Sequence, residues 1–268
     1  MGPLVHTQRL QMRIATWNVN SVRARLPRVL AWLVQAQPDV LCMQELKCQD
    51  HQFPLQAIED CGYNVEVFGQ KSWNGVAIAS RTPLSGVMRG VPDEADSQAR
   101  GMSAIAGGVM IVNLYVPNGQ AVGSDKYVYK LQWLDKLLAW LDAEAAPDDD
   151  LVVCGDFNIC PDARDVYEPE AWEGGILCSG PERARFEALK SWGLTDALRH
   201  VDESPGIYTW WDYRAAMFRR GLGLRIDHHL VSASVCSRIE AVEVDQSARR
   251  GEKPSDHAPV TLVLGEAP

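Results

Sequence analysis

The sequence predicts an α/β protein in which β-sheets pack face to face and helices cover their outer surfaces. Three observations indicate this class. Apolar or β-branched runs of strand length recur along the whole 268-residue chain. Helical patterns occur singly between groups of such runs, and strands outnumber helices. A simple alternating fold would instead place one helix after each strand.

Eight segments are typical of strands, because they are apolar or β-branched and are bounded by turn residues such as Asn74-Gly75. Pro117-Asn118-Gly119 marks another such turn. The expected strands are residues 13–17, 39–43, 63–68, 76–80, 110–116, 151–154, 225–231 and 259–264.

Three segments predict helices. The first begins near Pro27, which suits the first turn of a helix, and its apolar face consists of Leu26, Val29, Leu30, Leu33 and Val34. The second covers about residues 126–143, with one stripe formed by Tyr127, Leu131, Leu134, Leu138 and Leu141. The third covers residues 181–192.

No apolar run approaches the ~18 residues that a membrane helix needs, so no membrane association is expected. Residues 1–11 lack a charged start followed by an apolar core, which argues against a secretory signal. The seven cysteines form no CxxC motif. Cys42, Cys154 and Cys236 lie in apolar runs and indicate buried, reduced thiols, as in a cytoplasmic protein.

The net charge of −9 argues against a strongly cationic nucleic-acid-binding surface. The charge is unevenly spread, however. Residues 142–150 carry five acids and no base, whereas residues 208–225 interleave arginines with aromatic side chains. The latter combination is typical of surfaces that bind unstacked bases, although a solvated loop with core aromatics has the same composition. The residues are Arg214, Arg219, Arg220 and Arg225 with Trp210, Trp211, Tyr213 and Phe218.

Polar side chains follow several of the expected strands directly. Strand ends on a rigid sheet can hold side chains as accurately as catalysis requires. Each residue alone has an ordinary structural explanation, because Asn is common in turns and a single His or Glu can serve packing or the surface. The segments are Trp17-Asn18-Val19-Asn20, Gln44-Glu45, Asn113 to Asn118, Gly155-Asp156-Phe157-Asn158, Asp227 and Ser255-Asp256-His257.

Taken together, these residues indicate a metal-dependent site. The four carboxylates, with neighbouring amides, offer the hard oxygen ligands that suit Mg²⁺ or Mn²⁺. No Cys/His cluster has zinc spacing, and the adjacent His228 and His229 would point to opposite sides of a strand. Metal-assisted hydrolysis of a phosphate ester is therefore the predicted chemistry. The carboxylates are Glu45, Asp156, Asp227 and Asp256.

A series of motifs, in order and spacing, resembles the exonuclease III family of abasic-site endonucleases over about residues 12–264. The resemblance implies a four-layer α/β sandwich of two mixed sheets with outer helices. A single catalytic domain is expected over residues 12–268, with residues 1–11 as a flexible extension in front of the first strand, and the protein is expected to be a monomer. The motifs are ATWNVNSVRARL, DVLCMQELK, GVAIASR, NLYVPNG, GDFNICP, LTDALR, YTWWDYR, GLRID and KPSDHAPV.

The resemblance assigns roles to individual residues. Glu45 matches the metal-binding glutamate, supported by Asn18 and Asp256, with Mg²⁺ as the metal and Mn²⁺ as a substitute. Asp156 matches the residue that positions or deprotonates the attacking water, which Asn158 helps to orient. His257 matches the histidine at the scissile phosphate, and Asp227 holds its ring. Tyr115 and Asn118 match contacts to the phosphate and the leaving group.

The implied substrate is duplex DNA at abasic sites or blocked 3′ ends. Trp210, Leu224 and Ile226 match the apolar pocket for a base-free sugar, and Arg219 and Arg220 are expected to contact DNA. The chain departs from the family over residues 165–180, where Leu177 is expected to border that pocket. Whether this loop leaves room for an internal abasic site stays open, so 3′-end processing is the firmer expectation of the two.

Two alternatives remain at the level of the sequence. A nuclease restricted to 3′ ends would have little abasic endonuclease activity. A non-catalytic nucleic-acid-binding regulator should have lost at least one catalytic group, yet Glu45, Asp156, Asn158 and His257 are all present. The pocket motifs argue against a phosphohydrolase of the same superfamily that acts on lipids or undamaged DNA.

Overall fold

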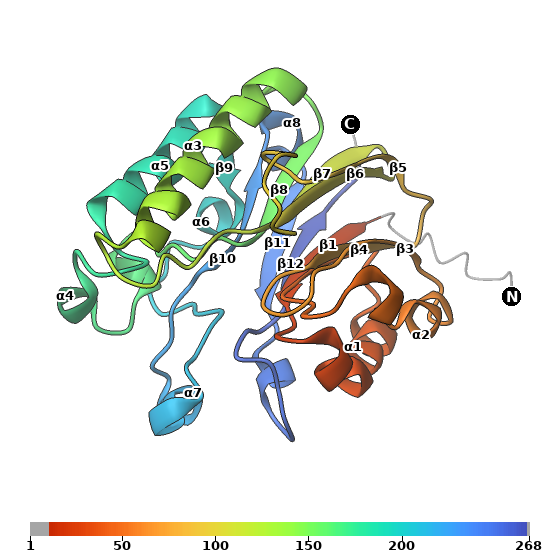
Figure 1. Ribbon diagram of the computed structural model, residues 1–268, viewed down its shortest axis with the longest axis horizontal. Coiled ribbons are helices and arrows are strands. Elements are labelled where there is room, and N and C mark those ends of the chain that lie inside the picture. Colours follow the sequence, from red (N-terminus) through yellow and green to blue (C-terminus); the bar gives the residue numbers. More distant parts are fainter. Residues whose placement is uncertain (1–10, 267–268) are drawn as a thin grey trace, which may run out of the picture.

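Two six-stranded mixed sheets form the centre of the molecule (Figure 1). The computed structural model describes residues 11–266, so the expected flexible extension lies almost wholly outside the described residues. In spatial order, the first sheet consists of β11 (Ile239–Val244), β12 (Val260–Leu264), β1 (Met12–Asn18), β2 (Val40–Gln44), β4 (Val76–Ser80) and β3 (Asn64–Phe68). The second consists of β5 (Ser85–Arg89), β6 (Gly101–Ala106), β7 (Val109–Tyr115), β8 (Leu151–Asp156), β10 (Asp227–Val231) and β9 (Thr195–Asp196).

The two sheets share one pairing pattern. In each, the two central strands are parallel, β1 with β2 and β7 with β8. All other neighbours are antiparallel. Parallel neighbours end at the same edge of a sheet, so each sheet presents two strand ends side by side.

Helices cover the outer face of each sheet. α1 (Val22–Ala36) and α2 (Leu55–Glu59) pack on the first sheet, whereas α3 (Asp125–Glu144) and α5 (Gly180–Trp192) cover the second (Figure 1). A third apolar cluster fills the space between the sheets. The four-layer sandwich is thus confirmed. Short helices complete the fold: α4 (Pro169–Trp172), α6 (Ala197–Val201), α7 (Met217–Arg220), α8 (Ala233–Cys236), η1 (Asp50–Gln52), η2 (Ala163–Asp165), η3 (Arg214–Ala216) and η4 (Gln246–Arg249).

The first helix begins earlier than its apolar pattern predicts. Ser21 caps it by accepting a hydrogen bond from the backbone N–H of Ala24 at 3.4 Å. Pro27 therefore lies inside the helix rather than in its first turn. Val34 was placed wrongly on the buried face, because its side chain is 65% exposed. Trp32 takes a buried position instead and packs against Trp17 of β1.

The second predicted helix is confirmed as α3, but its buried face differs from the expected stripe. Leu131 and Leu138 are only partly buried, whereas the charged Lys130 is fully buried. The buried positions are Tyr127, Lys130, Trp133, Leu134, Leu137 and Leu141. The buried face of α3 is thus shifted by about one residue from the expected stripe. Lys130 can lie on this face because it has polar partners inside the protein.

All eight expected strands are present, and four more were missed. β5, β6, β9 and β11 carry small or polar residues. Within residues 11–266, no helix is long and apolar enough to cross a membrane. All seven cysteines are free thiols, although Cys236 is only partly buried.

Candidate active site

The ends of the four central strands bring the predicted catalytic groups together. Asn18 ends β1, Glu45 follows β2, Tyr115 ends β7 and Asp156 ends β8. Gly155 is required just before the last of these: its φ is +142°, and a Cβ atom there would lie 1.9 Å from the carbonyl oxygen of Leu114. The backbone of β8 thus lies close to β7, and Asp156 turns toward the space between the sheets.

A hydrogen-bonded group of polar side chains occupies this space. The Asn18 amide donates to Glu45 Oε1 and to Asp156 Oδ2, each at 2.9 Å. The Tyr115 hydroxyl donates to Glu45 Oε1 at 2.9 Å. Lys47 Nζ lies 2.8 Å from Glu45 Oε2. Two carboxylates from different sheets are therefore held side by side by neutral and positive donors.

His257 lies on the loop before β12 and is held from both sides. Its Nδ1 lies 2.9 Å from Asp227 Oδ2, and its Nε2 lies 3.7 Å from Asp156 Oδ2. The Thr209 hydroxyl donates to Asp227 Oδ2 at 2.6 Å, which fixes that carboxylate. Asp227 thus orients the ring so that Nε2 faces Asp156.

The burial and charges of the site move two pKa values upward. Burial raises the pKa of Asp156, and the negative charges of Asp227 and Glu45 add to this, against the opposing effects of His257 and Asn18. Burial alone would lower the pKa of His257, but Asp227 and Asp156 outweigh it and raise that pKa well above the usual imidazole value. These neighbouring carboxylates thus favour the positively charged imidazolium form of the ring.

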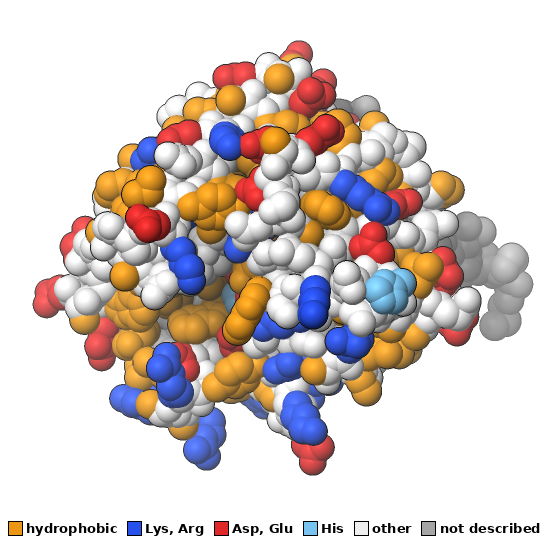
Figure 2. Space-filling model, viewed as in Figure 1, with side chains coloured by type: hydrophobic (Ala, Val, Ile, Leu, Met, Phe, Trp, Pro, Cys, Tyr) orange, Lys and Arg blue, Asp and Glu red, His pale blue; other side chains and the backbone are white. Residues whose placement is uncertain are grey.

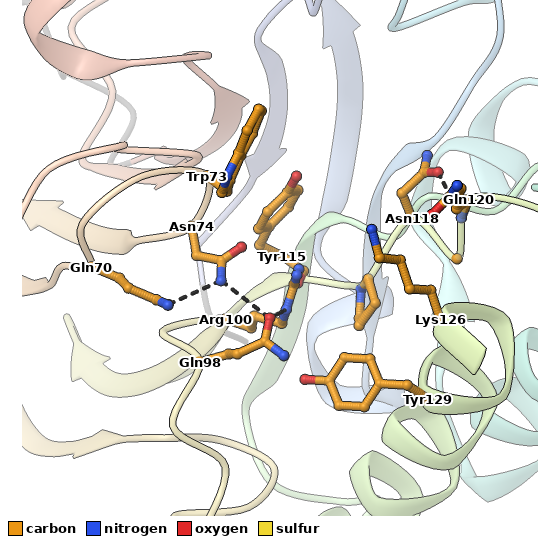
Figure 3. Close-up of a pocket in the computed structure, with 12 residues that line it drawn as sticks. Gln70, Trp73, Asn74, Gln98, Arg100, Tyr115, Asn118, Gln120, Lys126 and Tyr129 are labelled. Atoms are coloured by element: carbon orange, nitrogen blue, oxygen red, sulfur yellow. Dashed lines mark hydrogen bonds between the residues drawn. The ribbon is translucent and has the colours of Figure 1, made fainter. Parts of the chain in front are cut away.

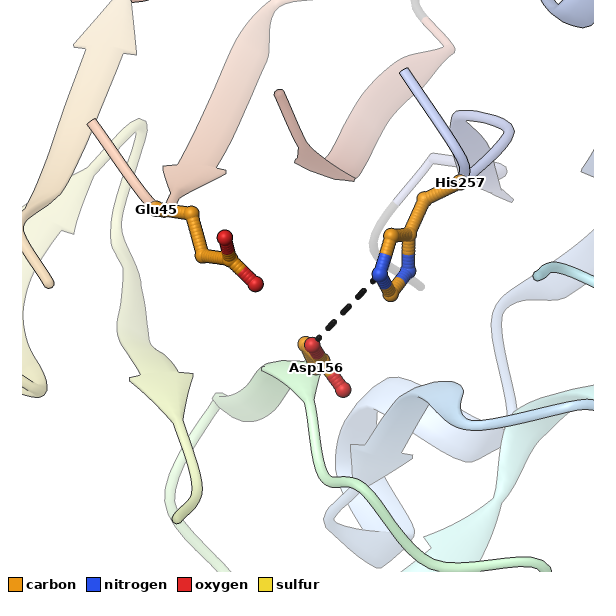
Figure 4. A group of neighbouring side chains, drawn as sticks. All are labelled: Glu45, Asp156 and His257. Atoms are coloured by element: carbon orange, nitrogen blue, oxygen red, sulfur yellow. Dashed lines mark ion pairs between the residues drawn. The ribbon is translucent and has the colours of Figure 1, made fainter. Parts of the chain in front are cut away.

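Glu45, Asp156 and His257 form a candidate metal centre. One possible ligand atom from each lies within 4.8 Å of the other two (Figure 4). His257 Nδ1 is bonded to Asp227, and the raised pKa of the ring favours the form without a free lone pair, so the two carboxylates are the better donors for a cation here. Oxygen donors of this kind suit a hard divalent ion.

The two asparagines predicted near the phosphate contact each other. Asn118 Nδ2 donates to Asn158 Oδ1 at 3.0 Å, and Asn158 Nδ2 donates to the carbonyl oxygen of Val116 at 3.0 Å. The backbone N–H of Asn158 donates to Asp156 Oδ1 at 2.9 Å. Asn118, Asn158 and Asp156 therefore form one connected side of the site.

Asp256 lies at the edge of this group rather than among the candidate ligands. Its carboxylate accepts from the Asn20 amide at 2.9 Å and from Trp210 Nε1 at 3.1 Å. The latter bond joins the polar centre to the expected sugar pocket. The predicted support of the metal by Asp256 stays a prediction, and in this structure the residue positions Asn20 and Trp210.

The three pocket residues meet beside His257. Trp210 forms isolated backbone bridges with both Leu224 and His257. Leu224 and Ile226 are buried in a cluster that also contains Leu177 and Cys178. Leu177 is only 6% exposed. The loop of residues 165–180 therefore packs directly onto the expected pocket.

The basic segment is divided by the fold. Arg219 and Arg220 are exposed on α7, and Figure 2 shows Lys and Arg side chains gathered around that end of the molecule. Arg225 was expected on the same basic face, and this prediction is wrong. It is buried and pairs with Asp165 at 2.6 Å and with Asp196 at 2.7 Å. Its charge is thus neutralised inside the protein.

Two features of the site were not predicted. Lys47 is two residues beyond Glu45, and this spacing within Gln44-Glu45-Leu46-Lys47 was the available signal. A cavity of about 640 Å³ opens beside Tyr115 and Asn118 (Figure 3). Trp73, which is 76% exposed, and Lys126 contribute to its wall. No periodic pattern marks these two residues, because both lie on exposed surfaces.

Paired carboxylates beside a buried His–Asp pair, on a scaffold of two facing sheets, fit the phosphate-ester hydrolysis that the sequence predicts. A model of the "Endonuclease/Exonuclease/phosphatase family" matches residues 15–257. The exodeoxyribonuclease III of Haemophilus influenzae is 33% identical over 262 residues, which cover 93% of this chain and 98% of that protein.

Solved structures agree with this match. A 3′ phosphatase from Neisseria bound to a product DNA hairpin superposes with a TM-score of 0.92 at 45% identity, covering 95% of this chain and 100% of the other. An AP endonuclease from Archaeoglobus fulgidus superposes with a TM-score of 0.91 at 38% identity, covering 94% of this chain and 99% of the other. The chain therefore belongs to the exonuclease III and AP endonuclease group of this family. Its activity is that of a DNA-repair nuclease, a phosphodiesterase of the exodeoxyribonuclease III kind.

Proposed function

We propose that this nuclease acts on duplex DNA and chiefly removes blocking groups and nucleotides from 3′ ends, with weaker cleavage at internal abasic sites. The packing of Leu177 and Cys178 against Leu224 and Ile226 carries this proposal. A base-free sugar flipped out of a duplex needs an open apolar pocket, whereas here Leu177 and Cys178 pack against the residues expected to line it. A 3′ end needs no flipped internal nucleotide.

The two carboxylates of Glu45 and Asp156 fit Mg²⁺, with Mn²⁺ as a substitute. When bound, the ion supplies positive charge at the phosphate and lowers the pKa of water. Glu45 is the proposed main ligand because Asn18, Tyr115 and Lys47 hold it in place. Asn18 is proposed to support the same site through both carboxylates.

The chain's own residues supply the remaining chemistry. Ionised Asp156 orients water and accepts its proton, and Asn158 and Asn118 fix this side of the site. The His257 imidazolium faces the phosphate and stabilises the negative charge that builds on its oxygens. Asp227 holds the His257 ring and keeps it charged. Tyr115 lies beside the phosphate, where its hydroxyl also orients Glu45.

One gel tests the order of activities. We expect duplexes with a 3′-phosphate and with a recessed 3′ end to react faster than a duplex with an internal abasic analogue, with Mg²⁺ or Mn²⁺ and not with EDTA. Leu177→Ala should raise the rate at the internal site, relative to the 3′-phosphate, by roughly tenfold or more, because it opens space for the sugar.

The matched control is Leu189→Ala, which removes the same atoms from the core beneath α5. It should lower stability without changing the ratio of the two rates. If the unaltered protein cleaves the internal site fastest, the proposed preference for 3′ ends is wrong.

The proposed path of the DNA runs along α7 and past the cavity beside Tyr115. Arg219 and Arg220 supply positive charge at one end, and Lys126 supplies it at the other. This arrangement lets a protein with net charge −9 bind a polyanion through a local basic strip.

Arg219→Ala combined with Arg220→Ala should weaken binding to duplex DNA and reduce its salt dependence. Each lost phosphate contact lowers the slope of log Kd against log salt by roughly one unit. Fluorescence anisotropy at several salt concentrations measures this slope. Arg89→Ala with Lys190→Ala, which removes two charges from β5 and α5, should leave the slope unchanged. An unchanged slope for the first variant would place the DNA elsewhere.

A further inference from the structure

Lys130 of α3 is a fully buried lysine whose ammonium contacts both loops that carry the catalytic amides. Its Nζ donates to the backbone carbonyl of Asn158 at 2.6 Å and to that of Asn118 at 3.3 Å. It also forms an ion pair with Glu182 of α5, whose side chain is equally buried. These three acceptors match the three N–H groups of an ammonium.

Glu182 connects this lysine to the loop that fills the sugar pocket. It belongs to the capping box of α5, in which Oε2 accepts from the backbone N–H and the hydroxyl of Ser179 at 3.0 and 2.6 Å. Its other oxygen, Oε1, accepts from the backbone N–H of Leu177 at 3.1 Å. The Tyr127 hydroxyl lies 2.6 Å from Ser179 Oγ, so α3 contacts the same turn again.

Leu177 depends on such anchoring because its backbone is in the left-handed region, with φ at +70°. A branched residue rarely adopts this conformation unless its surroundings hold it there. Its carbonyl accepts from the N–H of Cys160 at 2.7 Å, and its N–H donates to Glu182. Both peptide groups of Leu177 are therefore fixed, which directs its side chain into the pocket cluster.

We propose that the Lys130–Glu182 ion pair is a positioning and specificity element of the nuclease. It holds Asn118 and Asn158 against each other and keeps Leu177 in the sugar pocket. The first effect supports the rate of reaction, and the second excludes internal abasic nucleotides. This second effect rests on the proposed function. Lys130 acts through other residues, since its ammonium contacts two carbonyls and Glu182 rather than the reacting groups.

A stabilising role alone does not account for these contacts. Replacing a buried ion pair by neutral groups of similar volume is often neutral or favourable for stability, because burying two charges is costly. What apolar side chains could not supply are the bonds to the Asn158 carbonyl and the Leu177 N–H. These bonds lead to the two parts of the site that set rate and selectivity.

The test uses the double variant Lys130→Met/Glu182→Met, which removes both charges together with the acceptor of the Leu177 N–H and keeps the volumes similar. Single-turnover rates are measured on a 3′-phosphate duplex and on an internal abasic-analogue duplex, with thermal unfolding followed in parallel. We expect the 3′-phosphate rate to fall on the order of 100-fold, because the asparagines lose their placement. The ratio of internal to 3′-phosphate cleavage should rise by roughly tenfold.

The matched control is Lys190→Met/Glu187→Met, the same pair of substitutions at an exposed ion pair of α5. It should change neither the rates nor their ratio. An equal fall on both substrates in the first variant would show a merely structural role and would overturn the proposal. If that variant does not fold, Tyr127→Phe/Ser179→Ala decides, because it loosens the same turn without a change of charge. An unchanged ratio there also overturns it.

Leu177→Ala separates the two proposals. If it raises the ratio and the ion-pair variants do not, the pocket is closed by Leu177 but the ion pair does not control it. If Leu177→Ala leaves the ratio unchanged, the explanation for the 3′-end preference fails. The assignment of selectivity to Lys130 and Glu182 fails with it.

Discussion

Asp156→Asn should lower the single-turnover rate by about 10³-fold or more while leaving the affinity for DNA intact or higher. The variant cannot accept a proton from water, and general bases typically contribute about 10²–10⁴-fold. It also removes a negative charge from beside an anionic substrate. His257→Asn should lose rate as well as the contact to the phosphate, so its affinity should fall.

Asp227→Asn should be less harmful than either change, because Asp227 orients the His257 ring and does not face the substrate. Single-turnover rates at saturating Mg²⁺, with circular dichroism as a test of folding, give this order directly. If Asp227→Asn is as damaging as Asp156→Asn in a folded protein, Asp227 takes part directly in the reaction.

Asp156 and His257 together predict how the rate of reaction depends on pH. Asp156 is needed ionised, and its raised pKa moves the acid limb to higher pH than for a free carboxyl group. His257 is needed protonated, and its raised pKa moves the alkaline limb to higher pH than for free imidazole. The limbs belong to the coupled site. Asp227→Asn should move the alkaline limb to lower pH, because it removes the largest charge that raises the pKa of His257.

Glu45→Gln should weaken Mg²⁺ binding and turnover by more than roughly 100-fold, because changes even beyond the direct ligands of a metal cost about 10- to 100-fold. The fold should survive, since the Glu45 side chain is 17% exposed and a glutamine keeps an oxygen that accepts from Asn18 and Tyr115. Activity measured against Mg²⁺ concentration, together with calorimetric titration of the ion, checks both effects.

A suitable control is Glu66→Gln, which neutralises a carboxylate of β3 that pairs with Arg89 on the surface. It should bind Mg²⁺ and turn over as the unaltered protein does. Near-normal cleavage by Glu45→Gln at limiting Mg²⁺ would remove Glu45 from the metal centre.

The sequence predicted the layers and the strand ends well, because buried strands are apolar and end at polar motifs. The four missed strands lack this contrast: β5, β9 and β11 are edge strands, and β6 is rich in small residues. Burial of charge was also missed. Charged side chains such as Arg225 and Lys130 are normally expected at the surface. Their acidic partners lie far away in the sequence, so the sequence pattern did not show that the fold buries them.

The site was predictable as a set of residue types and not as a geometry. Asp156 and His257 could be assigned from their motifs, but the neighbours that raise their pKa values come from other strands. The position of Leu177 depends on a left-handed backbone held by Glu182, and neither feature has a periodic signal.

The topology of the sheets also has a consequence for biosynthesis. The second sheet is built from residues 85–231, whereas the first combines strands from both ends of the chain and pairs Met12 with Leu264. As the chain leaves the ribosome, β1 has no antiparallel neighbour until β12 emerges, and pairing between such distant segments is slow. His257 precedes β12 directly. The catalytic centre is therefore completed only after almost all of the strands of both sheets have been made, and it stays without His257 until that late step.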